Sequence, residues 1–130
     1  MPFAVWCPGC DTVKVSGAKG QSARMGTFTR VSGVTRFGRP VYQHANKEYL
    51  FYWEEHKSWK IGEDYTKSHA GVASEDGGNE LDAPMVPMGK WYESKGGTWQ
   101  ANSDITVICT STGAHFAPVD TTLSAIFRPE

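Results

Sequence analysis

Short segments with alternating apolar residues, separated by clusters of turn-forming residues, recur along the sequence of 130 residues. The separators combine Gly with Ser, Asn, Asp or Lys, as at positions 16–17, 32–33, 76–79 and 95–97. These combinations favour turns because Gly adopts positive φ angles readily and because Asn and Asp side chains bond to the nearby backbone. Strands at this spacing are typical of all-β domains, and no segment has the apolar period of an amphipathic helix.

We therefore predict an all-β fold with little or no helix. The expected strands cover residues 12–16, 26–31, 40–44, 48–54, 58–62, 71–74, 90–93, 98–101, 105–110 and 121–127. Residues 75–89 contain two prolines and little alternation, so we expect them to form the longest loop. The length suits one domain, and we expect residues 1–130 to form a single all-β domain with a loose tail at 128–130.

Two segments with similar residue patterns are predicted to form β-hairpins that carry a Trp on the returning strand. The first spans residues 48–59 and the second spans residues 90–100. Each has an aromatic pair followed by an acid, then a short polar turn, and then Ser or Thr before the Trp. Aromatic side chains on paired strands can meet across a hairpin and stabilise it. Two related hairpins favour a small antiparallel β-sandwich or a pseudo-symmetric barrel.

The first hairpin contains five consecutive bulky residues, Tyr-Leu-Phe-Tyr-Trp, at positions 49–53. Successive side chains of a strand point to opposite faces. One face of this strand is therefore either covered by a second layer or exposed as a surface that stacks on sugars or binds a protein partner. The candidate ligand-binding residues are the aromatic residues of the two hairpins: Tyr49, Phe51, Tyr52, Trp53, Trp59, Trp91 and Trp99.

Three cysteines allow three kinds of chemistry. Cys7 and Cys10 enclose Pro-Gly, and Cys109 closes an apolar strand segment. A thioredoxin-like redox site needs a helix after its first cysteine, whereas a strand pattern follows here. A zinc site could combine Cys7, Cys10 and Cys109 with His115. Alternatively, Cys109 pairs with Cys7 or Cys10 in a disulfide, or all three remain free thiols.

The net charge is −1, but its distribution is uneven. Residues 1–45 contain six bases and one acid, whereas the remainder contains seven bases and thirteen acids. The two parts either attract each other within one domain or leave a basic strip for an anionic partner. The small net charge argues against nucleic acid as that partner.

No apolar run reaches the length of a membrane span, so we expect none. The N-terminus lacks the basic and apolar regions of a signal peptide. These features favour a cytoplasmic location if Met1 is the native start.

Common enzyme motifs are absent from the sequence, including the nucleophile elbow, the zinc-protease helix motif and the phosphate-binding loops. We therefore favour a non-enzymatic module that binds a protein or a glycan through exposed aromatic residues and loops. The alternative is a zinc-binding structural or interaction domain built on Cys7, Cys10 and Cys109.

Overall fold

The computed structural model describes residues 10–112, which form one antiparallel sheet of nine strands. The strands are β1 (Thr12–Ser16), β2 (Gly26–Arg36), β3 (Arg39–His44), β4 (Tyr49–Trp53), β5 (Ser58–Gly62), β6 (Val72–Ser74), β7 (Trp91–Lys95), β8 (Thr98–Ala101) and β9 (Thr106–Ser111). Helix in this part of the chain is limited to two single 3₁₀ turns, η1 (Ser22–Arg24) and η2 (Ala83–Met85). The all-β prediction is therefore confirmed.

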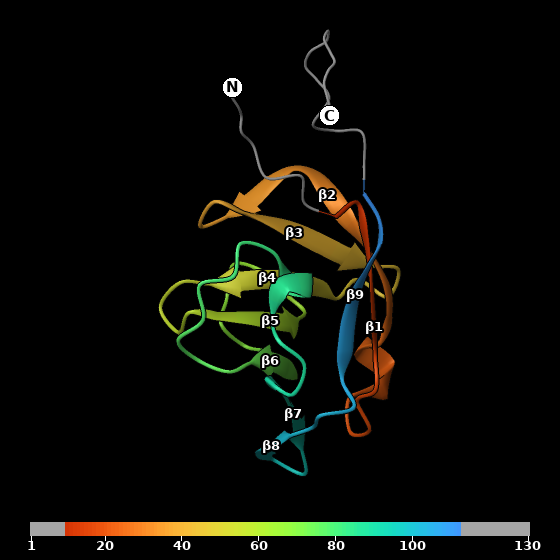
Figure 1. Cartoon of the computed structure of the whole chain (residues 1–130), viewed down its shortest axis with the longest axis vertical. Coiled ribbons are helices and arrows are strands. Elements are labelled where there is room, and N and C mark those ends of the chain that lie inside the picture. Colours follow the sequence, from red (N-terminus) through yellow and green to blue (C-terminus); the bar gives the residue numbers. More distant parts are fainter. Residues whose placement is uncertain (1–9, 113–130) are drawn as a thin grey trace, which may run out of the picture.

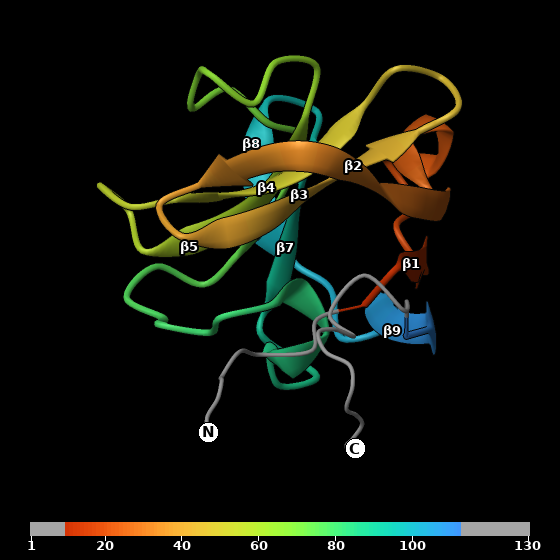
Figure 2. The same cartoon turned by 90° about the horizontal axis from the view of Figure 1, so that it is seen from above.

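Each strand from β1 to β8 lies beside the next strand in the sequence, and β9 returns to pair with the free side of β1. The sheet curls strongly, so that β1 and β9 stand beside the ends of the other strands (Figure 1). Seen from above, the sheet forms a half-barrel, and the connection that carries η2 lies across its open side (Figure 2). This single curled sheet differs from the two stacked sheets of a sandwich.

The hydrophobic core fills the concave side of this sheet. In β5, Trp59 and Ile61 are fully buried in the core, whereas Ser58 and Lys60 belong to the opposite face. Strands β1 to β4, β6 and β7 also contribute buried core side chains, and the η2 connection adds Ala83 and Val86. All four residues of β8 are exposed. The largest fully buried side chains are Trp59, Trp91, Tyr42, Tyr52, Phe28, Phe51, Leu50, Ile61 and Ile105.

Strand β4 is covered on both faces at its centre. Leu50 and Tyr52 point into the core, and Phe51, on the opposite face, is also fully buried. A second aromatic layer lies on that outer face, where the Trp53 ring packs edge to face against Phe51 and Phe37, with centroids 6.4 and 5.9 Å apart. The crowding of this segment therefore reflects burial from both sides.

The two predicted hairpins are pairs of neighbouring antiparallel strands, but they differ in how their aromatic side chains meet. In β4–β5, Tyr52 lies opposite Trp59, and the two rings are 5.7 Å apart in an edge contact. In β7–β8, Trp99 lies opposite Ser94 instead, and Trp91 points into the core. The second hairpin does not repeat the aromatic pair of the first.

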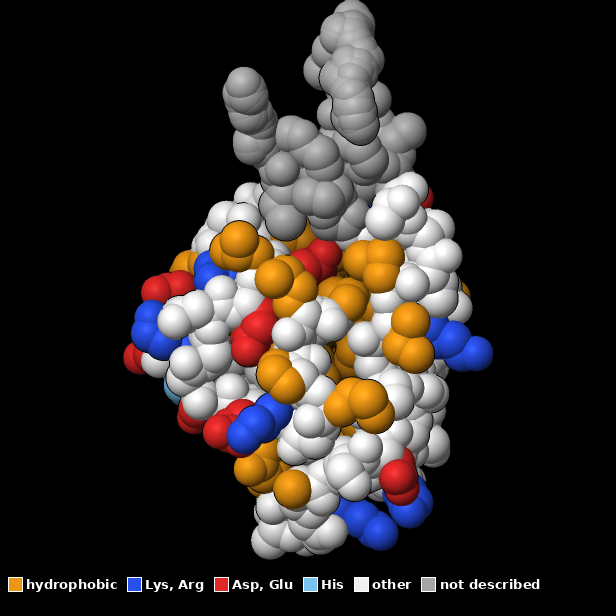
Figure 3. Space-filling view, in the orientation of Figure 1, with side chains coloured by type: hydrophobic (Ala, Val, Ile, Leu, Met, Phe, Trp, Pro, Cys, Tyr) orange, Lys and Arg blue, Asp and Glu red, His pale blue; other side chains and the backbone are white. Residues whose placement is uncertain are grey.

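The long connection from β6 to β7 contains η2 and no strand, as expected for residues 75–89. The buried Asp82 caps η2 through the amide of Ala83 and also accepts bonds from the Tyr42 hydroxyl at 2.7 Å and the Cys10 amide at 3.1 Å. Hydrophobic side chains gather over this connection and β9 in the front view (Figure 3). The segments predicted at 121–127 and 128–130 lie outside the described residues.

Within residues 10–112, no helix is long and apolar enough to cross a membrane.

Candidate functional site

A pocket of about 360 Å³ opens beside strands β5 to β8. Its lining combines aromatic, basic and acidic side chains: His56, Lys60, Ala73, Ser74, Glu75, Asp76, Tyr92 and Trp99. Its volume falls within the usual range of sites for small ligands, roughly 300–1,000 Å³. The mixture of ring surfaces and charged groups makes it the best candidate site in the described part of the chain.

The register of the sheet explains why space exists there. Lys60 lies between Phe51 on β4 and Ala73 on β6, and Ala73 in turn lies opposite Tyr92 on β7. These side chains form one row on the outer face because register partners point to the same side. Ala73 is the small member of the row, so it leaves a gap between the lysine and the tyrosine. Trp99, on the edge strand β8, is 50% exposed and borders this gap.

Backbone hydrogen bonds bring the acidic segment after β6 to the same place. The Gly77 amide donates to the His56 carbonyl at 3.1 Å, and the Gly78 amide donates to the Lys57 carbonyl at 2.8 Å. Gly77 has a φ of 94°, a conformation that glycine adopts without strain. The turn between β4 and β5 is thereby joined to the segment that carries Asp76.

Two opposite charges face the pocket without touching each other. The Lys60 side chain is almost entirely buried, and no hydrogen bond or ion pair from residues 10–112 reaches its ammonium group or the Asp76 carboxylate. Burial lowers the pKa of Lys60 because it disfavours the charged amine, and the negative charge of Asp76 opposes this shift in part. Glu75 differs, because its carboxylate lies 3.5 Å from the Lys90 ammonium.

The structure places the seven aromatic candidates very differently. Phe51, Tyr52, Trp59 and Trp91 are buried, so in this conformation they support the fold and offer no surface to a ligand. Tyr49 and Trp53 are half-buried, since their rings pack on Tyr65 and on Phe37 respectively. Trp99 is the candidate with an exposed ring, and it borders the pocket.

The cysteines show one of the predicted alternatives, a disulfide. Cys10 and Cys109 are bonded, with their Cα atoms 5.6 Å apart, and they join the start of β1 to β9. In this form their sulfurs are not the thiolates that zinc requires. Cys7 and His115 lie outside the described residues, so the zinc site stays a prediction. Among residues 10–112, no group of three His, Cys, Asp or Glu side chains could hold a metal ion.

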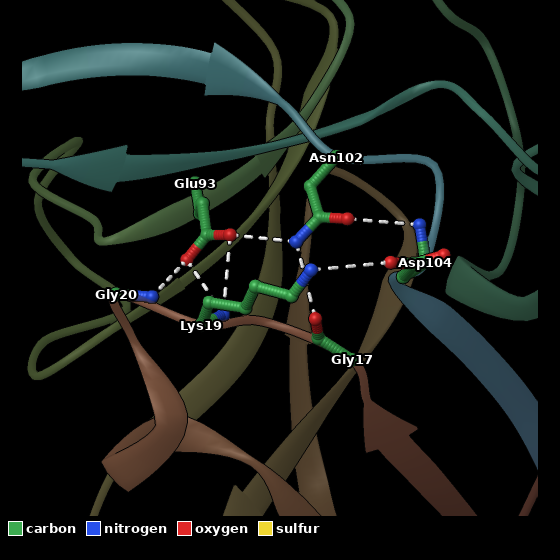
Figure 4. Close-up of polar contacts among 6 residues, drawn as sticks. All are labelled: Gly17, Lys19, Gly20, Glu93, Asn102 and Asp104. Atoms are coloured by element: carbon green, nitrogen blue, oxygen red, sulfur yellow. Dashed lines mark hydrogen bonds and ion pairs between the residues drawn. The ribbon is translucent and has the colours of Figure 1, made fainter.

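A polar cluster around the buried Glu93 joins the two ends of the curled sheet (Figure 4). Its carboxylate accepts hydrogen bonds from the amides of Lys19 and Gly20 at 2.6–3.1 Å and from the Asn102 side chain at 2.6 Å. Asn102 also donates to the Gly17 carbonyl at 3.1 Å. Every polar atom of this carboxylate is engaged by the protein, which indicates a structural role.

Basic side chains of residues 1–45 form ion pairs with acidic side chains of the remainder in two places. This is the outcome expected if the two oppositely charged parts attract each other within one domain. Arg24 pairs with Glu48 in a half-buried contact, and the Lys19 ammonium lies 3.5 Å from the Asp104 carboxylate. Arg39 stacks on the Tyr52 ring at 3.8 Å. Part of the basic strip is therefore used within the fold.

No family model, curated protein or solved structure matches this chain.

Proposed function

We propose that the protein is a non-enzymatic binding module that holds a sugar ring of a glycan in the pocket beside Trp99. The observation that carries this proposal is the exposed Trp99 ring bordering a pocket that also contains the Lys60 amine and the Asp76 carboxylate, neither of which has a partner among residues 10–112. The face of an aromatic ring carries partial negative charge. It therefore attracts the C–H groups that cover one side of a sugar. Trp99 is therefore a suitable stacking platform.

The charged groups of the pocket favour hydroxyl-rich ligands. A hydroxyl can accept a hydrogen bond and donate one at the same time. Neighbouring sugar hydroxyls can therefore accept from Lys60 and donate to Asp76, which satisfies both groups that the protein leaves unpaired. A purely anionic ligand would be repelled by Asp76, and a purely cationic one by Lys60. The sequence left protein and glycan partners open, and this mixed polarity favours the glycan.

The disulfide supports a setting in which glycans are common ligands. Disulfides persist mainly in oxidising compartments such as the cell exterior, and the Cys10–Cys109 bond joins two strands of the core sheet. The disulfide therefore favours an oxidising compartment over the cytoplasmic location that the N-terminus favoured.

The test is a glycan-array screen followed by calorimetric titration of the best neutral saccharide. Trp99→Ala should weaken binding by about 2 kcal/mol, or about 30-fold in Kd, which is typical of a central aromatic contact. Phe37→Ala is the matched control, because Phe37 is 43% exposed and lies outside the pocket. The Phe37→Ala variant should bind the saccharide with the affinity of the wild type. Absence of saccharide binding, or equal affinity of the Trp99→Ala variant, would refute the proposal.

A further inference from the structure

Lys60 has surroundings that are unusual for a lysine. It occupies the centre of β5, between the buried Phe51 on β4 and the buried Ala73 on β6, and the residue as a whole is 6% exposed. No hydrogen bond or ion pair from residues 10–112 holds its amine, which faces the pocket. A buried amine of this kind is the form of lysine that acts as a nucleophile in proteins.

The titratable groups around the amine are few. His56, Glu75, Asp76 and Tyr92 line the same pocket. Burial lowers the pKa of Lys60, and Asp76 opposes that shift in part through its negative charge. Glu75 is engaged by Lys90. The balance increases the fraction of neutral amine at a given pH above that of an exposed lysine.

We propose that Lys60 is a reactive amine that captures small aldehydes entering this pocket as imines. A pocket of about 360 Å³ admits an aldehyde of a few carbon atoms. The rings of Tyr92 and Trp99 line the pocket and offer apolar contacts to the carbon atoms of such an aldehyde. Hydroxylated aldehydes suit the site best, because their hydroxyls can bond to Asp76.

The reaction balances without an added oxidant or reductant. The nitrogen lone pair attacks the carbonyl carbon, a C–N bond forms, and the carbonyl π electrons move to oxygen, which takes up a proton. The carbinolamine then loses this oxygen as water while the nitrogen lone pair forms the C=N bond. Both hydrogens of the released water derive from the neutral amine, by way of solvent or of His56, which lines the pocket.

The experiment uses glycolaldehyde as the probe, with cyanoborohydride to reduce each imine to a stable secondary amine. The folded full-length chain is treated near pH 7, and the labelling of every lysine is followed by peptide mass spectrometry. Lys67 and Lys95 are the internal controls because both are exposed. Lys60 should be labelled faster than either control, and the ratio should fall towards one near pH 10, where ordinary lysines also lose their proton.

Two variants sharpen this test. Asp76→Asn removes the charge that favours the ammonium form, so labelling of Lys60 should accelerate while that of Lys67 stays constant. Glu54→Gln is the matched control and should leave the Lys60 rate unchanged, because Glu54 lies outside the pocket and pairs with Lys57. The inference is overturned if Lys60 in the folded wild type is labelled no faster than Lys67 near pH 7, whether from protonation or from lack of access.

This inference uses the pocket of the proposed function but does not require glycan binding. Selective labelling of Lys60 without any saccharide binding would retain the inference and refute the proposed function. Saccharide binding without selective labelling would do the reverse. Protection of Lys60 by a bound neutral saccharide would support both, since the two ligands would then compete for one pocket.

Discussion

Glu93→Gln should destabilise the protein far more than its small chemical change suggests. The wild-type carboxylate accepts from the amides of Lys19 and Gly20 with one oxygen and from Lys19 and Asn102 with the other. A glutamine keeps one acceptor oxygen. In place of the other carboxylate oxygen it has an NH₂ group, which faces N–H donors and cannot accept from them. Asn102 cannot turn its own amide without losing its bonds to the Gly17 carbonyl and the Asp104 amide.

The magnitude follows from the bonds that are lost. About two hydrogen bonds to a charged, buried acceptor disappear. At about 1–3 kcal/mol for each donor left unsatisfied, the free energy of unfolding should fall by about 2–6 kcal/mol. Glu54→Gln is the matched control, because Glu54 is exposed and pairs with Lys57 at the surface. That change should alter stability by less than about 1 kcal/mol.

The pH dependence gives the same prediction a second readout. Burial acts to raise the pKa of Glu93, but the hydrogen bonds from Asn102 and from the amides at Lys19 and Gly20 outweigh it, so the pKa lies below its usual value. A group with a depressed folded pKa stabilises the fold above its unfolded pKa of about 4.3, and this contribution is lost as the pH falls further. The difference between wild type and Glu93→Gln should therefore shrink in acid.

Urea unfolding of the oxidised protein, monitored by tryptophan fluorescence between about pH 7 and about pH 3, measures both quantities. A Glu93→Gln variant as stable as Glu54→Gln would show that the cluster does not hold the ends of the sheet together. A difference from the wild type that stays constant across this range would show that the charge of Glu93 does not contribute.

Two further predictions concern the disulfide and a buried tyrosine. Reduction of the Cys10–Cys109 bond, which spans 99 residues of sequence, should lower the free energy of unfolding by about 4–5 kcal/mol. Melting curves recorded with and without reductant should therefore differ, and coincident curves would contradict this. Burial, and secondarily Asp82, raises the pKa of Tyr42 far above its usual value. The neutral hydroxyl therefore contributes fully to the free energy of unfolding below the unfolded pKa of about 10, and this contribution is lost at higher pH. Tyr42→Phe should be less stable by about 1 kcal/mol near neutral pH and should lose less stability in alkali; equal alkaline losses in urea titrations would refute the assignment.

The sequence predicts the strands well because alternation and turn chemistry act locally. The segments expected at 12–16, 58–62 and 98–101 match β1, β5 and β8 residue for residue. Strand β2 is longer than expected because the Ser-Gly pair at 32–33 does not end it. The register with β3 shifts between Arg30 and Thr35, and Gly33 adopts a φ of 78° there. The turn signal is used as an irregularity within a strand.

The curl of the sheet was not predictable, because it depends on contacts between distant residues. Alternation assigns each side chain to a face, but it does not show whether that face meets a second sheet or the same sheet bent back. Glu93 and Lys19 are 74 residues apart in sequence, and their bond fixes one end of the curl against the other. The disulfide also joins residues far apart in sequence, because it links the segment just before β1 to the neighbouring strand β9. Neither pairing has a local signal.

The sequence did not single out Lys60 for a related reason. Alternation with Trp59 and Ile61 places Lys60 on the face opposite the core, and lysines on such faces are usually exposed. The pocket beside it instead depends on Tyr92 and Trp99, which lie more than thirty residues later in the sequence. One signal in the sequence could have indicated its burial. In the hairpin of residues 48–59, Lys60 lies opposite Phe51, a member of the aromatic run.

The location of the pocket follows from the sizes of the side chains along one row of the outer face. The row passes from Phe51 to Lys60, Ala73, Tyr92 and Ala101 on five successive strands. Lys60 is buried in this row, and the small side chain of Ala73 leaves space between Lys60 and Tyr92. An edge strand then supplies an exposed ring, because beyond β8 no further strand of the described residues covers it. The aromatic residues of the first hairpin, β4–β5, are therefore mainly buried in the fold. The second hairpin, β7–β8, contributes the exposed ring.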